Sequence, residues 1–421
     1  MRHAGTLPYE AIHVGGSLAR TITLIRHAET TSNIGGTWQG QSDSPLSDRG
    51  RMQVEHLAQR VNGHGAALLV ASDLGRTQTT AEVVGPNERD AAWREFDLGE
   101  WDNLRPAEIK ERYPEIERSR FGAGDFQPPG GERFSGFIER TRGAFDALAD
   151  RLDDGDEAMV VTHGGVVQTV VGSLLGVPDQ SAMLVPSNTS LTTIRILEDG
   201  AQVYSYNDDL HLDGEVARPG GTRLRLFRHG KTVANSEGRW VGQSETPLTE
   251  EGRRQAEALA EAAHPLDVVV SSPLSRARDT AAPVAARQGR EVTINEGFAE
   301  FFFGEWEGLN VAEIRERDAD TFHHIHVEGN DEPRGRIGET FRGVGERMAG
   351  AAESVASNGA GAVGVFTHGG ATRAYAAHLL GIPFADREQL PVPRNTAHME
   401  LIWTGGEARL SSYNIASHLD H

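Results

Sequence analysis

Cysteine is absent from the 421-residue chain. Disulfide bonds, thiol nucleophiles and cysteine-ligated metal sites are therefore excluded, although this absence does not settle the cellular compartment. Long hydrophobic runs are also missing, because no segment approaches the roughly 18 uninterrupted apolar residues of a membrane-spanning helix. The first 20 residues lack the continuous apolar stretch that a secretory signal needs. We therefore expect a cytoplasmic protein without a membrane partner.

Positive charge is scarce relative to negative charge. The chain has 41 Lys and Arg residues against 61 Asp and Glu residues, which gives a formal net charge of -20. A surface this acidic argues against binding to nucleic acid or to anionic lipid. It does not argue against a small anionic substrate, because a few arginines can create a locally positive field.

What the chain does have is a long internal repeat, which predicts duplicated domains. We expect domains at residues 21–213 and 222–421, a Pro/Gly-rich linker at 214–221 and an N-terminal extension at 1–20. The segments that recur in the same order are LIRHAETTSN (24–33) and LFRHGKTVAN (226–235), SDLGRTQTTAEVV (72–84) and SPLSRARDTAAPV (272–284), REFDLGEWDNL (94–104) and AEFFFGEWEGL (299–309), THGG (162–165) and THGG (367–370), and YNDDLHLD (206–213) and YNIASHLD (413–420).

Each half alternates short apolar runs with segments of helical spacing. In the first half, the runs TITLI, ALLVA and AMVVT are typical of buried parallel strands. LTTIRIL and QVYSY predict a hairpin that closes the unit. Strands alternating with helices indicate a layered α/β sheet.

Charged and imidazole side chains follow these predicted strands at the point where each strand ends. Arg26 and His27 follow TITLI, Arg76 follows ALLVASD, and His163 follows AMVVT and precedes two glycines. Ligands in open α/β sheets bind outside the carboxyl ends of the strands, so we expect these side chains to meet there. The second half supplies the corresponding Arg228, His229, Arg276 and His368.

Two arginines, two histidines and a helix N-terminus suit a dianionic tetrahedral group. Guanidinium groups bind phosphate oxygens in pairs. A neutral imidazole can attack phosphorus, and nearby arginines disfavour the imidazolium form. A carboxylic acid must then protonate the leaving alkoxide, and the candidates are the glutamates of REFDLGEW and AEFFFGEW.

Four features carry a family resemblance: the RHAETTSN segment, the arginine of SDLGRTQTTA, the E-x-x-x-G-x-W segment and the late T-H-G-G. Together they resemble the histidine phosphatase superfamily, also called the phosphoglycerate mutase-like family. The resemblance implies a duplicated three-layer α/β/α fold with a mostly parallel central sheet. It implies that His27 and His229 become phosphohistidines. It also implies that Glu95 and Glu300, rather than Glu100 and Glu305, act as acid and base. The residues that would hold the phosphoryl group are Arg26, Asn33, Arg76 and His163 in the first half and Arg228, Asn235, Arg276 and His368 in the second.

Several of these residues have an alternative interpretation. Asn33 and Asn235 could instead bond their own backbone in a loop. The inserts at 105–131 and 310–338 differ between the halves, and inserts in this family cap the pocket and select the substrate. The candidate selectors, which could equally be exposed helix charges, are Arg112, Arg118, Arg120, His323, His324 and His326. The HHIH run at 323–326 lacks a distant partner motif, so we expect no metal site.

The sequence thus predicts hydrolysis of a small phosphorylated metabolite through a phosphohistidine, at two sites, without metal or organic cofactor. A phosphomutase is one alternative. A chain with one active half and one non-catalytic binding or dimerising half is the other. The substrate, the packing of the two halves and the oligomeric state remain open.

Overall fold

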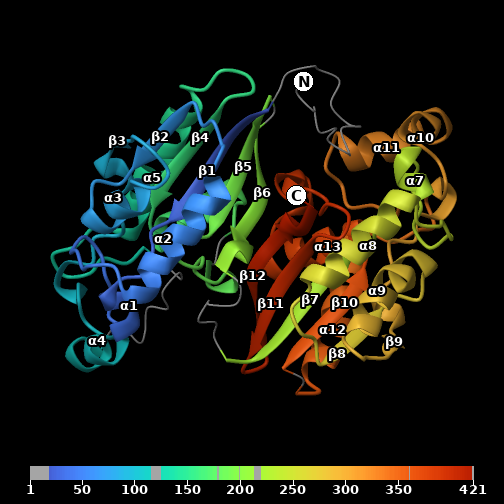
Figure 1. Ribbon diagram of the computed structural model, residues 1–421. Helices are drawn as coiled ribbons and strands as arrows, with labels where there is room; N and C mark the ends of the chain where they lie inside the picture. The colour runs from blue at the N-terminus through green and yellow to red at the C-terminus, as the bar shows by residue number, and fades with distance from the viewer. Residues whose placement is uncertain are drawn as a thin grey trace.

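The structure is a computed structural model that describes residues 19–114, 125–177, 180–198, 200–212, 220–359 and 361–419. The expected N-terminal extension and linker lie almost entirely outside these residues. The first half (Figure 1) contains β1 (Arg20–Arg26), α1 (Thr31–Gly35), α2 (Asp48–Val61), β2 (Leu68–Ala71), α3 (Gly75–Ala81), β3 (Glu88–Arg89), α4 (Pro106–Arg112), α5 (Phe134–Ala149), β4 (Glu157–Thr162), α6 (Gly164–Leu174), β5 (Leu191–Leu197) and β6 (Gly200–Asp208).

Among the residues that the structure describes, the second half repeats this order of helices and strands and has one further helix in its insert. It contains β7 (Thr222–Arg228), α7 (Val233–Ser236), α8 (Glu250–Ala262), β8 (Val268–Ser271), α9 (Ser275–Arg287), β9 (Val292–Ile294), α10 (Val311–Arg317), α11 (Ala319–His326), α12 (Phe341–Ala356), β10 (Ala362–Thr367), α13 (Gly369–Leu380), β11 (His398–Thr404) and β12 (Glu407–Ile415). The added helix is α11.

The strands form a single 12-stranded sheet in the order β3-β2-β4-β1-β5-β6-β12-β11-β7-β10-β8-β9. Within the first half, β3, β2, β4 and β1 run parallel to one another, β5 pairs antiparallel with β1, and β5 and β6 form an antiparallel hairpin. The second half has the same arrangement. The predicted α/β fold with a mostly parallel sheet and a closing hairpin is therefore confirmed.

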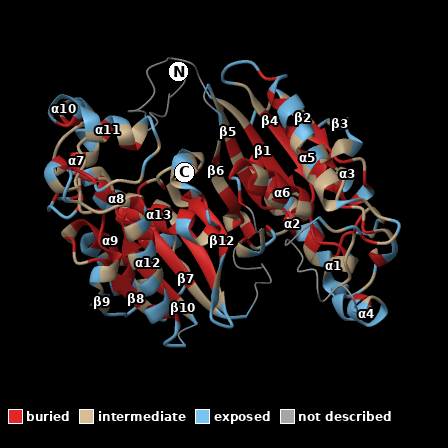
Figure 2. Ribbon diagram, turned by 180° about the vertical axis from the view of Figure 1, so that it is seen from behind, coloured by how far each residue is buried: buried red, intermediate tan, exposed pale blue. Residues whose placement is uncertain are grey.

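Helices cover both faces of this sheet and bury its apolar residues (Figure 2). Along β1, Ile22 and Leu24 pack in the cluster that includes residues of α5 and α6, whereas Ile25 packs with residues of α2 and α3. Such alternation is expected because successive side chains of a strand point to opposite faces. The result is the three-layer α/β/α architecture that the family resemblance implied.

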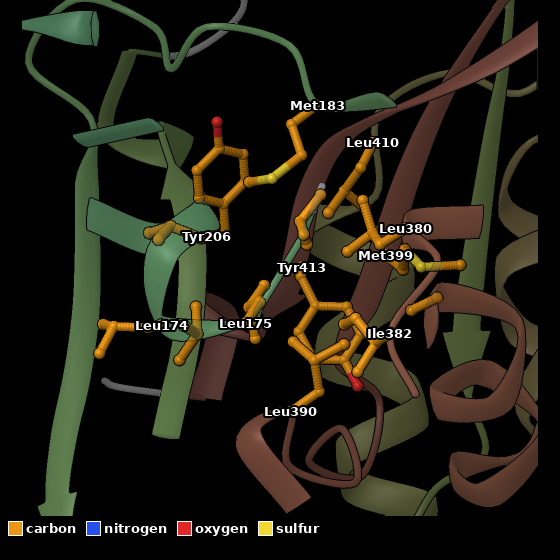
Figure 3. Close-up of a cluster of buried hydrophobic side chains, with 14 of the residues drawn as sticks. Leu174, Leu175, Met183, Tyr206, Leu380, Ile382, Leu390, Met399, Leu410 and Tyr413 are labelled. Carbon is orange, nitrogen blue, oxygen red and sulfur yellow. The ribbon is translucent and has the colours of Figure 1, made fainter. Parts of the chain in front are cut away.

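The two halves are joined edge to edge. Strand β6 pairs antiparallel with β12 through Tyr206 and Tyr413, which are equivalent positions of the repeat. Each half therefore presents the same edge to the other, as in a twofold-symmetric dimer. Pairing two sheet edges also removes the exposed backbone groups that would invite aggregation. Buried apolar side chains of both halves belong to one continuous cluster at this junction (Figure 3).

No helix in the described ranges is both long and apolar enough to cross a membrane.

Candidate active site

Arg26 and His27 lie where β1 ends and the chain leaves the sheet. His27 is buried, with 4% of its surface exposed, and its Nδ1 lies 2.8 Å from the carbonyl oxygen of Ala28. A carbonyl can only accept a hydrogen bond, so Nδ1 carries the proton and Nε2 keeps its lone pair. The Arg26 guanidinium donates to the Pro186 carbonyl at 2.6 Å, which fixes its position beside the ring.

Arg76, on the first turn of α3, supplies a second buried guanidinium. Two of its nitrogens donate to the carbonyls of Gly40 and Ser42, both at 2.7 Å. Its Nε lies 3.3 Å from His27 Nε2, at the lone pair. Backbone carbonyls therefore hold the guanidinium so that its remaining donor faces the nitrogen expected to attack phosphorus.

His163 follows β4 and stands at the N-terminus of α6. Its Nε2 shares a hydrogen bond of 2.9 Å with the Ser72 hydroxyl, and its ring centroid lies 5.3 Å from that of His27. His163 Nδ1 and Arg26 Nε are both buried and have no hydrogen-bond partner among the described residues. Buried polar atoms normally have partners, so these two atoms are suited to contact an anionic ligand beside His27.

Glu95 faces the same helix N-terminus. One carboxylate oxygen accepts from the backbone N–H of Gly165 at 3.0 Å, and the other accepts from Phe96 N–H at 2.8 Å. Glu100 is exposed and accepts from the Tyr113 hydroxyl instead. Sequence spacing alone did not separate the two glutamates. The structure brings Glu95, and not Glu100, next to Gly165.

The second half brings together the equivalent groups. The ring centroids of His229 and His368 lie 5.2 Å apart, and His229 Nδ1 donates to the Gly230 carbonyl at 2.7 Å. Arg276 Nε donates to His368 Nδ1 at 3.2 Å, whereas its counterpart Arg76 faces the other histidine. The guanidinium Nε thus faces the first histidine in one half and the second histidine in the other.

The remaining members of the second site are placed as in the first. Arg228 donates to the Pro393 carbonyl at 2.6 Å. Glu300 is 7% exposed and accepts from the backbone N–H groups of Phe301, Gly370 and Ala371 at 3.0, 3.0 and 2.8 Å. Glu305 is exposed and lies 3.7 Å from Arg336.

Burial and neighbouring cations control the charge of the four histidines. Burial, then Arg76 and other nearby charges, lower the pKa of His27 and His163 well below 6.5. Burial and Arg276 do the same for the pKa of His229 and His368. Burial also lowers the pKa of Arg26, to about 10, so this guanidinium stays charged at neutral pH. Each site therefore combines neutral imidazoles with permanent cations.

Asn33 and Asn235 take part in helix capping, and their Oδ1 atoms lie 3.5 and 3.3 Å from Nδ2 of Asn188 and Asn395, respectively. Asn33 Oδ1 accepts from Thr30 N–H at 3.0 Å while the Thr30 hydroxyl accepts from Asn33 N–H, which is a reciprocal capping box at α1. Asn235 and Thr232 repeat this arrangement at α7. The alternative interpretation as loop-bonding residues thus describes the carbonyl end of each amide, and the NH₂ end is still able to donate to a ligand.

Sequence reasoning missed the loop that precedes β5. Asn188 Nδ2 donates to the His27 carbonyl at 2.8 Å, and Asn395 Nδ2 donates to the His229 carbonyl at 2.9 Å. Both belong to a recurring V-P-x-N-T segment at 185–189 and 392–396, a signal that could have revealed them. Ser72 and its counterpart Ser272, which bind the second histidine of each half, were also missed.

The proposed selector residues do not form one group. Arg112 ends α4 and is exposed, while Arg118 and Arg120 lie outside the described residues. On α11, His323 lies 3.6 Å from Glu328, His324 lies 3.4 Å from Glu332, and His326 stacks on Phe322 with ring centroids 4.4 Å apart. In the part of the chain that the structure describes, no three His, Asp or Glu side chains are grouped as metal ligands would be.

The family model of the histidine phosphatase superfamily (branch 1) matches residues 22–209 and again residues 224–416. The chain belongs to the histidine phosphatase superfamily. It carries two tandem copies of the family's domain.

Curated relatives resemble one copy at a time. A probable phosphoglycerate mutase, GpmB, of Cronobacter sakazakii is 35% identical over 37% of this chain and 75% of its own length. The protein of the same description from Yersinia enterocolitica is 33% identical over 46% of this chain and 94% of its own length.

Solved structures of similar proteins likewise match about half of the chain. A mycobacterial glucosyl-3-phosphoglycerate phosphatase in complex with VO3 is 32% identical over 46% of this chain and 98% of its own, with a TM-score of 0.41. A mutant phosphoserine phosphatase from Entamoeba histolytica in complex with phosphoserine is 28% identical over 47% of this chain and 99% of its own, with a TM-score of 0.43.

Proposed function

We propose that this member of the histidine phosphatase superfamily hydrolyses a small-molecule phosphomonoester through a phosphohistidine, at one site in each half. The observation that carries the proposal is the contact between Arg76 Nε and His27 Nε2, 3.3 Å apart. This contact holds a cation beside the lone pair of a neutral imidazole. A phosphoryl group bound there would accept hydrogen bonds from the guanidinium and place phosphorus beside the imidazole nitrogen. The equivalent set of residues in the second half supports a second site.

In the first step, His27 Nε2 would attack phosphorus. The N–P bond forms, the ester P–O bond breaks, and Glu95 gives its proton to the departing alkoxide oxygen. Arg26, Arg76 and His163 would bind the three phosphoryl oxygens, where charge is spread in the loose transition state of phosphoryl transfer. Because the guanidinium donors are already held by backbone carbonyls, little reorganisation is needed during the reaction.

In the second step, the Glu95 carboxylate would take a proton from water, whose oxygen attacks phosphorus. The N–P bond breaks, inorganic phosphate leaves, and His27 regains its neutral form with the proton on Nδ1. Glu300 and His229 would carry the same steps in the second half. The inserts that contain α4 and α11 are the proposed substrate selectors, since their sequences differ strongly between the two halves.

A phosphomutase is the second candidate, and the description of the curated relatives as probable phosphoglycerate mutases favours it. A mutase retains the phosphohistidine until the phosphoryl group returns to the substrate at another oxygen. A hydrolase instead admits water to the phosphohistidine. The two candidates therefore share the first step and differ in the fate of the intermediate.

The test is a panel of phosphorylated metabolites incubated separately with His27→Ala and His229→Ala, with inorganic phosphate and isomerised phosphate ester both measured. The proposal predicts stoichiometric release of inorganic phosphate by each variant. Isomerised ester without phosphate release would establish a mutase. Activity in only one of the two variants would establish a chain with a single active half.

A further inference from the structure

We propose that Asn207 and Asn414 are positioning residues that tie each half's active-site loop to the other half's sheet, so that each site depends on the junction between the halves. This inference rests on the proposed function. It concerns two residues that follow directly after Tyr206 and Tyr413, the pair that joins β6 to β12.

Asn207, on β6, connects the active-site loop of its own half, which contains Ser187, to the opposite half through a single side-chain amide. Its Oδ1 accepts from the Ser187 N–H at 2.7 Å, and its Nδ2 donates to the Ser411 carbonyl of β12 at 2.8 Å. The residue is buried, with 4% of its surface exposed. Because the amide is planar, the two bonds cannot move independently, and a shift of β12 would displace Ser187.

Ser187 lies between the loop residues that hold the proposed nucleophile. The preceding Pro186 carbonyl accepts from Arg26 at 2.6 Å. The following Asn188 donates to the His27 carbonyl at 2.8 Å, and Thr189 N–H donates to the Arg26 carbonyl at 2.9 Å. A displacement of this loop therefore changes the positions of both Arg26 and His27.

Asn414 makes the same connection in the opposite direction. Its Oδ1 accepts from the Arg394 N–H and its Nδ2 donates to the Tyr204 carbonyl of β6, both at 2.7 Å. The neighbouring Pro393 carbonyl accepts from Arg228, and Asn395 donates to the His229 carbonyl. The amides thus cross the junction in both directions, and each asparagine directly follows a tyrosine of the apolar cluster drawn in Figure 3, Tyr206 or Tyr413.

The backbone at both asparagines is specialised for this role. Their φ angles are 58° and 59°, in the left-handed region where few residues other than glycine and asparagine are stable. Glycine would keep this backbone conformation but has no side-chain amide to make the two hydrogen bonds. A misplacement of about 1 Å at a catalytic group can cost on the order of 100-fold in rate. The loss of the amide is therefore expected to act on catalysis as well as on the junction.

The experiment measures the first site alone, in full-length protein carrying His229→Ala. In this background, Asn207→Gly is expected to lower kcat at least ~10-fold with a smaller change in KM, since positioning acts on the reacting groups. In the His27→Ala background, which reports the second site, the same substitution is expected to change kcat less than about threefold. The control is Gln202→Ala, which removes a different bond across the junction, from Gln202 Nε2 to the Glu388 carbonyl.

Asn207→Asp provides a readout that a purely structural role would not produce. The carboxyl oxygen can replace the amide Oδ1 at Ser187, but only the protonated acid can donate to the Ser411 carbonyl. Burial raises the pKa of such a carboxyl group. The kcat of Asn207→Asp relative to its His229→Ala parent should therefore rise reversibly as the pH is lowered from about 8 to about 5.

Three results would each overturn the inference. The first is an active His229→Ala parent whose kcat is unchanged by Asn207→Gly, and the second is a loss of equal size in Gln202→Ala. The third is a ratio of the kcat of Asn207→Asp to that of its parent that does not vary with pH. An inactive His229→Ala parent would instead contradict the proposed function of the first half, so the two failures are distinguishable.

Discussion

His27 and His163 lie side by side because they follow the same register pair of two neighbouring strands. Parallel strands β1 and β4 pair through Arg26 and Thr162, and the next residue of each strand is a histidine of the site. The second half repeats this relationship, since Arg228 pairs with Thr367 just before His229 and His368. Sheet register thus sets the spacing of the two imidazoles, and α3 or α9 adds the arginine between them.

The first prediction concerns the arginine that faces the imidazoles. In the His229→Ala background, Arg76→Ala should lower kcat by about 10²- to 10³-fold, because it removes one fixed donor at the developing charge. Arg76→Lys should recover little, since one ammonium cannot bind the Gly40 and Ser42 carbonyls and still face His27 as the guanidinium does.

The matched control for Arg76 is Arg51→Ala. Arg51 is an exposed residue of α2 that pairs with the exposed Asp48. Its loss should leave kcat within about twofold, because exposed ion pairs contribute little. Steady-state kinetics on an aryl phosphate would decide the matter, and a similar kcat for both variants would contradict the proposed role of Arg76.

The second prediction concerns the close approach of Gly165 to Glu95. A Cβ atom at Gly165 would lie 2.3 Å from Glu95 Oε1, a distance that requires the carboxylate to move. Gly165→Ala should therefore lower the activity of the first site about as much as Glu95→Gln does. Gly143→Ala is the control, because a Cβ atom there meets nothing within 4 Å and alanine favours the helix α5. Equal kinetics for Gly165→Ala and Gly143→Ala would contradict the placement of Glu95.

The third prediction concerns a buried ion pair found in one half. Arg225 Nε donates to Glu400 Oε2 at 2.7 Å, with the two side chains 7% and 0% exposed. The paired strands of the first half carry Thr23 and Thr193 at the equivalent positions, with their hydroxyl oxygens 3.5 Å apart. Arg225→Ala should lower the free energy of unfolding by about 3–5 kcal/mol, since it leaves a buried carboxylate without its cation.

The double variant Arg225→Thr/Glu400→Thr should cost much less than the two single threonine variants added together, because it removes both charges and installs the pairing already used at Thr23 and Thr193. Urea denaturation of the parent, the two single variants and the double variant measures this coupling. Additive effects would show that the two side chains do not depend on one another.

The fourth prediction concerns acid stability. The pKa of His163 is lowered by burial and by Arg76, so the folded protein keeps this ring neutral where the unfolded chain binds a proton. The contribution of this neutral histidine to the free energy of unfolding is therefore fully present above the unfolded-state pKa of about 6.5. It is lost as the pH falls below that value, by up to about 1.4 kcal/mol per pH unit for each such histidine. His27, His229 and His368 should contribute in the same direction.

His163→Asn tests this linkage, because it removes one of the four titrating rings. Its free energy of unfolding should fall less steeply than that of the parent between about pH 6.5 and about pH 5, by up to about 1.4 kcal/mol per pH unit. Urea denaturation at several pH values provides the two slopes. Identical slopes would mean that His163 binds protons equally well in the folded and unfolded states.

Much of one half could be predicted from its own sequence. The β-branched run before Arg26 and the run before His163 are short and bounded by turn residues, which is the pattern of buried parallel strands. Because the ends of such strands meet at one edge, the order of motifs was enough to bring Arg26, His27, Arg76 and His163 together. The duplication then supplied the same expectation for the second half.

Other contacts could not be predicted because they depend on geometry that leaves a weak local pattern. The pairing of Tyr206 with Tyr413 follows from the fit of two sheet edges, and any β-hairpin offers an edge. The difference between Glu95 and Glu100 depends on which side chain reaches the N–H of Gly165. In the sequence, both glutamates lie close to Gly99, so the spacing does not distinguish them. Ser72 is a small polar residue before a helix, and such residues usually act as turn or cap residues.

We propose that each half holds its own histidine nucleophile. Hydrolysis of p-nitrophenyl phosphate by the parent protein, His27→Ala, His229→Ala and the double variant provides the test. Each single variant should keep part of the parent activity, and the double variant should have none above background. Undiminished hydrolysis by the double variant would show that neither histidine is the nucleophile.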